Sequence, residues 1–178
     1  MKKKIEDALR QLVGMRLLRI RLTGSIRGFG FTSSAPGQMT YDEPGEWTLQ
    51  VDCTWRVEHD GKIYTGTEDW YEYPGGKEPN DWDPDDNRGL QVELLRKLMN
   101  DESTASDIRN VSGSFAVEAV EASDCGDVVI HLGPGEWILR VFPSGSVGDS
   151  WALFRREKGG TFLTFHGSPP TDSTKENS

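Results

Sequence analysis

An eight-residue segment that occurs twice constrains the fold of this chain more than any other feature of the sequence. Residues 44–51 read Pro-Gly-Glu-Trp-Thr-Leu-Gln-Val and residues 134–141 read Pro-Gly-Glu-Trp-Ile-Leu-Arg-Val, so six of the eight positions are identical. In each copy a Pro-Gly turn leads into alternating apolar and polar residues, which is the pattern of a strand. The recurrence indicates either two copies of one structural unit or a chance match, because the rest of the two halves aligns weakly and the interval exceeds any solenoid repeat.

The first copy begins the longest alternation in the sequence, over residues 46–58. A period of two residues gives a strand one buried face and one solvent face. The pair Asp60-Gly61 follows and favours a two-residue hairpin turn, so we expect residues 63–67 to return as the partner strand. The apolar side of the alternating segment consists of Trp47, Leu49, Val51, Cys53, Trp55 and Val57.

The other periodic segments divide into two helices and several strands. Apolar residues recur at helical spacing over residues 4–13 and 89–99, and Gly14 stands where the first helix would end. Alternation predicts further strands over residues 18–22, 115–120, 128–132, 137–142, 151–156 and 161–166, with a bulged strand over 24–31 and a Gly159-Gly160 hairpin turn.

These elements predict an α+β, strand-dominated fold with antiparallel sheets arranged as a sandwich or a partly open barrel. A chain of 178 residues is long enough for one domain. We expect a single domain over residues 1–167, made of two pseudo-repeated helix-plus-strands units at about 1–88 and 89–167. The polar composition of residues 168–178 predicts a disordered tail.

The composition favours a cytoplasmic protein. No run approaches the ~20 apolar residues that span a bilayer, and acidic residues stand where a signal peptide needs its apolar stretch. Two cysteines in a chain of this length make no disulfide framework. We therefore expect no membrane association and no export by the signal-peptide route.

Charge is distributed unevenly along the chain, whose net charge is -9. Residues 1–27 carry eight Lys or Arg and two acids, whereas residues 42–86 carry fourteen acids and three Lys or Arg. A negative field of this size disfavours nucleic acid and anionic membranes and favours a cationic protein partner. The alternative is that the acids serve solubility alone.

Familiar catalytic patterns are missing from the sequence. It has no Gly-x-Ser-x-Gly elbow, no phosphate-binding glycine loop and no histidines at zinc-ligand spacing. The acidic run at residues 81–87 departs from a calcium loop, since its sixth position is Asp86 and its twelfth is Val92. We expect a protein with no cofactor and no metal, and a non-enzymatic role is the favoured interpretation.

Residues 68–86 form the strongest candidate for a binding segment because large aromatic side chains stand there among carboxylates. Aromatic residues supply contact area at interfaces, and acids meet Lys and Arg of a partner. The alternative is that this expected surface loop covers a sheet edge. The candidate partner-binding residues are Glu68, Asp69, Trp70, Tyr71, Tyr73, Asp81, Trp82, Asp83, Asp85 and Asp86.

A second hypothesis places a small-molecule or enzymatic site between the two halves, where pseudo-twofold interfaces often leave a pocket. Its candidate residues are Trp55 and Arg56, together with Glu68 and Asp69. The sequence determines neither the ligand nor the oligomeric state.

The chain also resembles a set of small uncharacterised bacterial proteins, some of them suspected immunity proteins of toxin systems. The resemblance spans about residues 13–166 and implies a similar strand-packed fold, with an immunity-type inhibitor as the role it suggests. The acidic segment at residues 68–86 has no counterpart in the resemblance, and its use as the binding surface is our own hypothesis. It implies no catalytic residues. The positions that carry it are Gly14 before a strand, Trp47-x-Leu49, Trp55-Arg56, Gly66 to Asp69, Leu139-x-Val141-Phe142 and Trp151.

Overall fold

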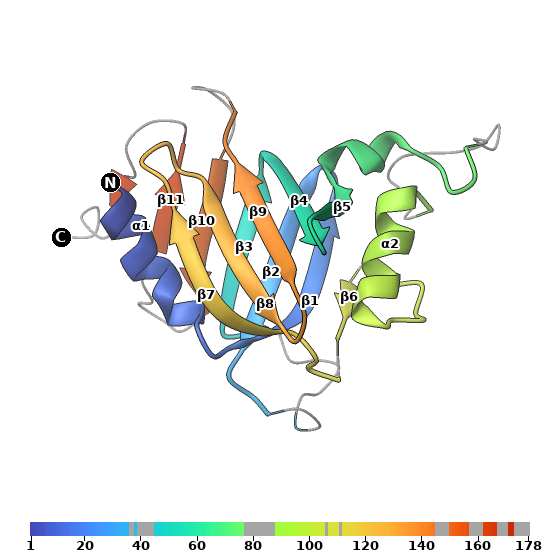
Figure 1. The fold of residues 1–178 in the computed structure, drawn as a ribbon, viewed down its shortest axis with the longest axis horizontal. Helices are drawn as coiled ribbons and strands as arrows, with labels where there is room; N and C mark the ends of the chain where they lie inside the picture. Colours follow the sequence, from blue (N-terminus) through green and yellow to red (C-terminus); the bar gives the residue numbers. More distant parts are fainter. Residues whose placement is uncertain are drawn as a thin grey trace.

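A computed structural model describes residues 1–35, 38, 45–76, 88–105, 107–110, 112–144, 150–156, 162–166 and 171–172 (Figure 1). The first half contains helix α1 (Lys2–Leu9), the 3-10 helix η1 (Arg10–Leu12), β1 (Arg16–Thr23), β2 (Ile26–Thr32), β3 (Trp47–Asp52), β4 (Thr54–His59), β5 (Lys62–Gly66) and the 3-10 helix η2 (Thr67–Tyr71). The second half contains α2 (Leu90–Met99), β6 (Asp107–Arg109), β7 (Ala116–Ala122), β8 (Val128–Gly133), β9 (Trp137–Phe142), β10 (Ser150–Arg155), β11 (Phe162–Phe165) and β12 (Thr171–Asp172).

The described strands form one antiparallel sheet that is not closed. Their order is β12-β11-β10-β3-β2-β1-β7-β8-β9-β4-β5, and β6 pairs with β1 off this path. Two helices accompany the strands, so the prediction of a strand-dominated α+β fold is confirmed. The pair Thr171 and Asp172 lies in the segment expected to be a disordered tail, and it hydrogen-bonds to β11 as β12.

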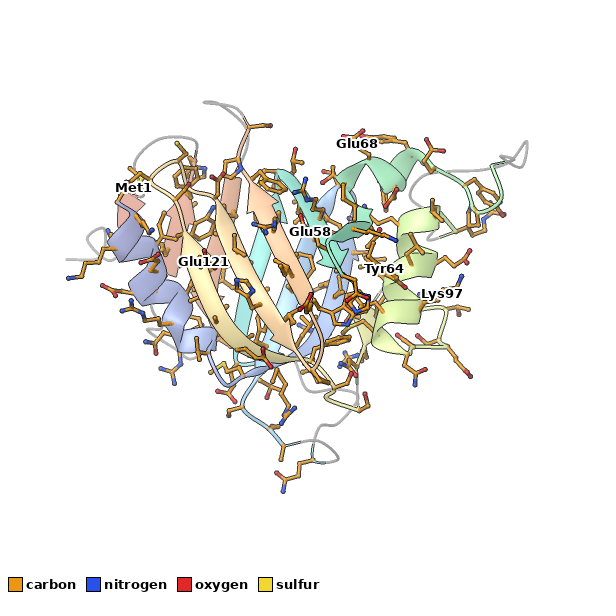
Figure 2. All side chains as sticks on the ribbon, in the orientation of Figure 1. Met1, Glu58, Tyr64, Glu68, Lys97 and Glu121 are labelled. Carbon is orange, nitrogen blue, oxygen red and sulfur yellow. The ribbon has the colours of Figure 1, made fainter. Side chains whose placement is uncertain are left out.

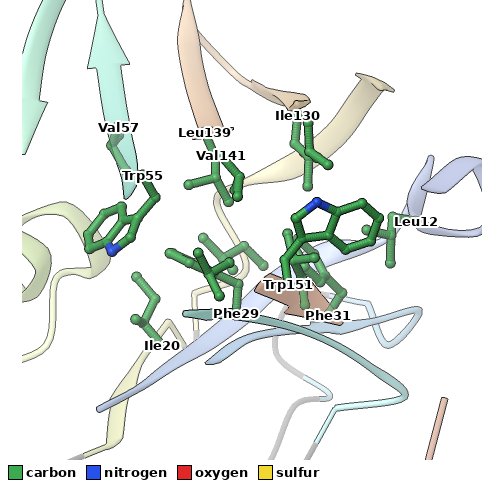
Figure 3. Packing of buried hydrophobic residues seen from close by; sticks show 14 of the residues in the cluster. Leu12, Ile20, Phe29, Phe31, Trp55, Val57, Ile130, Leu139, Val141 and Trp151 are labelled. Atoms are coloured by element: carbon green, nitrogen blue, oxygen red, sulfur yellow. The ribbon is translucent and has the colours of Figure 1, made fainter. Parts of the chain in front are cut away.

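The sheet bends where β1 meets β7, because these two strands are paired only through Arg16 and Ala116. In Figure 1 the strands β7, β8 and β9 consequently lie in front of β1, β2 and β3. Side chains from both parts meet in a common core, where the rings of Phe29 on β2 and Trp55 on β4 contact edge to face at 5.5 Å (Figure 3). Burying such apolar surface stabilises the fold by about 25 cal/mol per Å².

The predicted strand over residues 46–58 is interrupted at Cys53, where the chain passes from one part of the sheet to the other. The segment before the interruption, β3, pairs with β2 and β10, whereas β4 pairs with β9 and β5. The alternation continues across this bend, with Val51 fully buried and Trp55 2% exposed. The apolar–polar alternation keeps the same period before and after Cys53, because β3 and β4 face the same core from opposite directions.

The strand pairs β3–β10 and β9–β4, each of which joins the two halves of the chain, have matching registers. Val51 of β3 stands opposite Trp151 of β10, and Val141 of β9 stands opposite Trp55 of β4. At the other ends of these pairs, Trp47 is opposite Arg155 and Trp137 is opposite His59. Trp47 and Trp137 each contact the planar group of the residue opposite. The Arg155 guanidinium lies 5.8 Å from the centre of the Trp47 ring, and the His59 ring stacks on Trp137 with 3.9 Å between ring centres.

The turn and helix predictions are largely confirmed. Residues Asp60 and Gly61 have positive φ angles of 50° and 71°, as the two-residue turn between β4 and β5 requires. The first helix covers residues 2–9 and continues as η1 to Leu12, and α2 begins one residue later than predicted. No helix in the described ranges is long and apolar enough to cross a membrane. The predicted Gly159-Gly160 turn lies outside the described residues.

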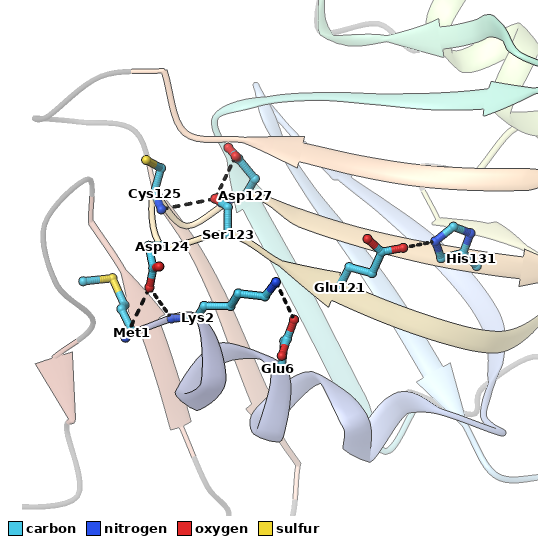
Figure 4. Close-up of polar contacts among 9 residues, drawn as sticks. All are labelled: Met1, Lys2, Glu6, Glu121, Ser123, Asp124, Cys125, Asp127 and His131. Carbon is cyan, nitrogen blue, oxygen red and sulfur yellow. Dashed lines mark hydrogen bonds and ion pairs between the residues drawn. The ribbon is translucent and has the colours of Figure 1, made fainter.

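A tight turn between β7 and β8 contacts the start of the N-terminal helix α1 (Figure 4). The Ser123 hydroxyl donates to Asp127 at 2.8 Å and accepts the backbone N–H of Cys125 at 3.1 Å. The backbone N–H of Lys2 donates to the Asp124 carboxylate at 2.8 Å, and this bond is the main cause of the lowered pKa of Asp124. The turn therefore fixes the start of α1 against the end of β7.

Candidate partner-binding surface around η2

The structure places five of the ten candidate partner-binding residues in or just after the 3-10 helix η2. These are Glu68, Asp69, Trp70, Tyr71 and Tyr73. The other five, Asp81, Trp82, Asp83, Asp85 and Asp86, lie outside the described residues.

The beginning of η2 is fastened to strand β4 by backbone and hydroxyl contacts. The Thr67 hydroxyl accepts the Trp55 N–H at 2.9 Å and donates to the Trp55 carbonyl at 3.3 Å. The Asp69 carboxylate accepts the Gly66 N–H at 2.9 Å, which satisfies a donor at the helix start. Position 66 needs glycine because a Cβ there would lie 2.8 Å from the Trp55 carbonyl oxygen.

Beneath η2 lies a buried arginine that no described carboxylate pairs with. The side chain of Arg27 is 1% exposed, and its guanidinium carbon lies 4.2 Å from the ring centre of Trp70. Its Nη1 donates to the Gly24 and Ile26 carbonyls at 2.5 and 2.9 Å. Burial lowers the pKa of Arg27 to about 10, so the guanidinium stays charged at neutral pH.

Helix α2 completes the support through a buried amide. Gln91, 1% exposed, accepts from Arg27 Nε at 2.7 Å and donates from its Nε2 to the Gly66 carbonyl at 2.5 Å. One side chain therefore links β2, β5 and α2 directly below η2. Because Arg27 contacts Trp70 and is itself hydrogen-bonded to Gln91, Trp70 is held in a fixed position at the base of η2.

The outer surface of η2 combines an exposed aromatic ring with carboxylates. Tyr71 is 62% exposed, Glu68 and Glu72 are exposed, and Tyr73 is half-buried. Figure 2 shows Glu68 at the rim of the molecule, above Tyr64 and Lys97. We call the three exposed residues Glu68, Tyr71 and Glu72 the η2 surface.

The expectation that Trp70 lies in a surface loop is wrong. Trp70 is 9% exposed and belongs to η2, because its ring covers Arg27 and closes the end of the core. The sequence analysis missed Arg27 and Gln91. The inward orientation of Arg27 follows from its alternation with Phe29 and Phe31, which are both buried, and that signal was present in the sequence.

The alternative pair Trp55 and Arg56 does not line one site. The Trp55 ring lies in the core, whereas Arg56 is on the opposite face of β4, where its Nε donates to Glu58 at 2.5 Å and its guanidinium covers Phe142. Arg140 of β9 donates to the other oxygen of Glu58 at 2.9 Å. These neighbours form a surface ion-pair network across β4 and β9.

Glu58 is expected to make stability depend on pH. Burial raises its pKa, but the hydrogen bonds from Arg140 and Arg56 outweigh burial and leave the pKa below the ordinary value. This stabilisation is present at pH values above the unfolded-state pKa of about 4.3 and is lost as the pH falls through the folded-state pKa. In Glu58→Gln we expect a loss of about 1 kcal/mol at pH 7 and a flatter stability profile below pH 5.

Urea unfolding of both proteins between pH 3 and pH 7 measures this effect. The control is Glu72→Gln, which neutralises an exposed carboxylate and should change stability by less than about 0.5 kcal/mol. Equal acid sensitivity of Glu58→Gln and the unsubstituted protein would contradict the assignment.

Within the described ranges, no group of three or more His, Cys, Asp or Glu side chains could hold a metal ion. The acidic run at residues 81–87 lies outside those ranges. The chain matches no protein-family model, no curated protein and no solved structure.

Proposed function

We propose that the protein is a non-enzymatic, cytoplasmic protein-binding module that holds a cationic partner through the η2 surface and the acidic residues that follow it. The observation that carries the proposal is the buried Arg27, which supports Trp70 from below while Tyr71 beside it is 62% exposed. A large aromatic side chain fixed in position loses little conformational entropy on binding, and aromatic residues dominate interface energies.

Charge supports a basic partner. Residues 42–86 carry fourteen acids and three Lys or Arg, and two of these acids, Glu68 and Glu72, flank Tyr71 on the exposed surface. Complementary charge accelerates association with a cationic protein and rejects anionic ones. An immunity-type inhibitor that captures a basic toxin would use a surface of this kind, in keeping with the sequence resemblance.

A lysine-rich synthetic peptide provides a defined cationic probe for this surface. We expect fluorescence anisotropy to show binding that weakens as salt is added, and Tyr71→Ala to weaken it about tenfold. Replacing Asp81, Asp83, Asp85 and Asp86 with Asn should weaken binding further and reduce its dependence on salt.

Two controls separate this surface from general attraction to an acidic protein. Val13→Ala truncates an apolar residue that is 45% exposed on another part of the molecule, and Glu136→Gln removes an exposed carboxylate from the β8–β9 turn. Neither should change the affinity by more than about twofold. Salt-independent binding, or an unchanged affinity in Tyr71→Ala, would contradict the proposal.

We also infer that the fold consists of two copies of one helix-plus-strands unit that pack as a sandwich. In each half a three-strand meander, β1-β2-β3 or β7-β8-β9, is followed by a hairpin that pairs with the last meander strand of the other half. The matching registers of Val51 with Trp151 and Val141 with Trp55 support this inference. The repeated residues Gly45-Glu46-Trp47 and Gly135-Glu136-Trp137 then occupy equivalent places, at the starts of β3 and β9.

A further inference from the structure

A second surface, on the side of β1, β2 and β3 that faces away from the core, contains a pocket of about 360 Å³. This volume is within the range of about 300–1,000 Å³ that small-molecule sites occupy. None of the candidate residues from the sequence analysis lines it. We call it the arginine trough, and its principal lining residues are Arg19, Arg21, Gly28, Thr48, Gln50 and Phe154.

The trough exists because two outward-facing positions of β2 are glycines. In the sheet, Gly28 stands between Arg21 of β1 and Gln50 of β3, and Gly30 stands between Arg19 and Thr48. A Cβ at position 30 would lie 2.9 Å from Arg19 Cγ, so the Arg19 side chain lies over the bare backbone. The missing side chains leave a floor of β2 backbone between the arginines of β1 and the polar side chains of β3.

Positive charge is concentrated on one wall of the trough. Burial lowers the pKa of Arg19, Asp107 opposes this shift, and the charges of Arg109, Arg21 and Arg156 lower the pKa further. The charge of Asp107 is the main influence that raises the pKa of Arg19. Three arginines, Arg19, Arg21 and Arg109, lie around this carboxylate, and together they form a field that attracts an anion.

Asp107 compensates the two arginines that line the trough poorly. It lies 3.6 Å from Arg19 Nη1 and 3.9 Å from Arg21 Nε, and these distances exceed those of strong charge-assisted hydrogen bonds. Arg21 is also 64% exposed, so its guanidinium is accessible to a ligand. Guanidinium groups bind phosphate and carboxylate oxygens in a bidentate manner.

The other lining residues indicate which further chemical groups a ligand would have. Thr48 and Gln50 offer a hydroxyl and an amide that can hydrogen-bond polar edges of a ligand. Phe154, which stands opposite Thr48 on β10, contributes an aromatic ring to the lining. Cationic, polar and aromatic side chains therefore line one pocket.

We propose that the arginine trough binds an organic phosphate with a planar ring, of the size of a mononucleotide. The phosphate contacts Arg21 and Arg19, the ring packs against Phe154, and the polar edge of the ligand faces Thr48 and Gln50. None of the residues of the η2 surface lines this pocket, so the ligand proposal does not depend on the proposed cationic partner.

Isothermal titration calorimetry of the full chain with AMP, adenosine and inorganic phosphate tests the proposal. We expect AMP to bind at least about tenfold more tightly than adenosine or phosphate, since only AMP makes both kinds of contact. Arg21→Gln should weaken AMP about tenfold. Gly28→Ala should also weaken it, because the added methyl group occupies the floor while meeting only ordinary contacts at 3.5 and 3.7 Å.

The matched control is Arg10→Gln, which removes an exposed arginine charge from η1, outside the trough. It should leave AMP affinity within about twofold, and the melting temperatures of all three variants should stay close to that of the unsubstituted protein. The proposal is overturned if AMP binds no better than inorganic phosphate, or if Arg10→Gln weakens AMP as much as Arg21→Gln. Much tighter binding of a single-stranded oligonucleotide than of AMP would also overturn it, in favour of a nucleic-acid surface.

Discussion

Replacing Arg27 with alanine is expected to lower the free energy of unfolding by about 3 kcal/mol. The guanidinium donates to Gln91 and to the Gly24 and Ile26 carbonyls, and hydrogen bonds from charged groups stabilise by about 1.5–3 kcal/mol each. Relief of the buried charge offsets part of this loss. The remaining cost arises because these acceptors and the face of Trp70 lose their partner in a site closed to water.

Urea unfolding measures the loss, and hydrogen exchange locates it. The amides of residues 70–72 should exchange faster in Arg27→Ala, because η2 loses its support. Arg27→Met keeps most of the apolar stem and none of the donors, so it should be nearly as destabilised. Arg21→Ala, at a 64% exposed arginine of the neighbouring strand, should change stability by less than about 0.5 kcal/mol. Stability equal to that of the unsubstituted protein in both Arg27 variants would refute the role given to this side chain.

Gly126→Ala is expected to cost about 3 kcal/mol as well, for steric reasons. Gly126 has a φ of +88°, and a Cβ at this position would lie 2.2 Å from Cζ of Phe165. Phe165 is 2% exposed and stacks parallel to Trp151, whose Nε1 donates to the Gly126 carbonyl at 2.8 Å. The ring cannot withdraw without disturbing this stack, so backbone strain and overpacking add together.

A second glycine separates these two contributions. Gly75 has a similar φ of +82° and nothing within 4 Å of a built Cβ, so Gly75→Ala carries the backbone strain alone and should cost about 1 kcal/mol. Thermal unfolding of both variants gives the difference, which is the cost of displacing Phe165. If the two substitutions are equally destabilising, the ring contact is not what requires glycine at position 126.

The locally encoded parts of the fold were predictable from the sequence. Alternation identified β3 and β4, and the Asp60-Gly61 pair identified their following hairpin, because strand period and turn conformation depend on neighbouring residues. The interruption at Cys53 was not predictable, because the apolar residues keep the same period on both sides of it. Only the pairing of β3 with β10 and of β4 with β9 reveals that the chain changes position within the sheet.

The two candidate sites were also predictable only where their residues are close together in the sequence. The sequence pointed to residues 68–73 because acids and aromatic residues are adjacent there in the chain, but it placed Trp70 at the surface, since the arginine that its ring covers is more than forty positions away. The arginine trough depends on residues from β1, β2, β3 and β10, which no local pattern brings together.

Secondary structure, the strand-dominated class and the uneven charge were therefore determined by local sequence, because period, turn chemistry and composition act over a few residues. The bend of the sheet between β1 and β7, the support of η2 by Arg27 and Gln91, and the grouping of Arg19 with Arg109 were decided only in the tertiary structure. These features depend on strand pairing between distant segments, and pairing is selected by the burial of the whole core.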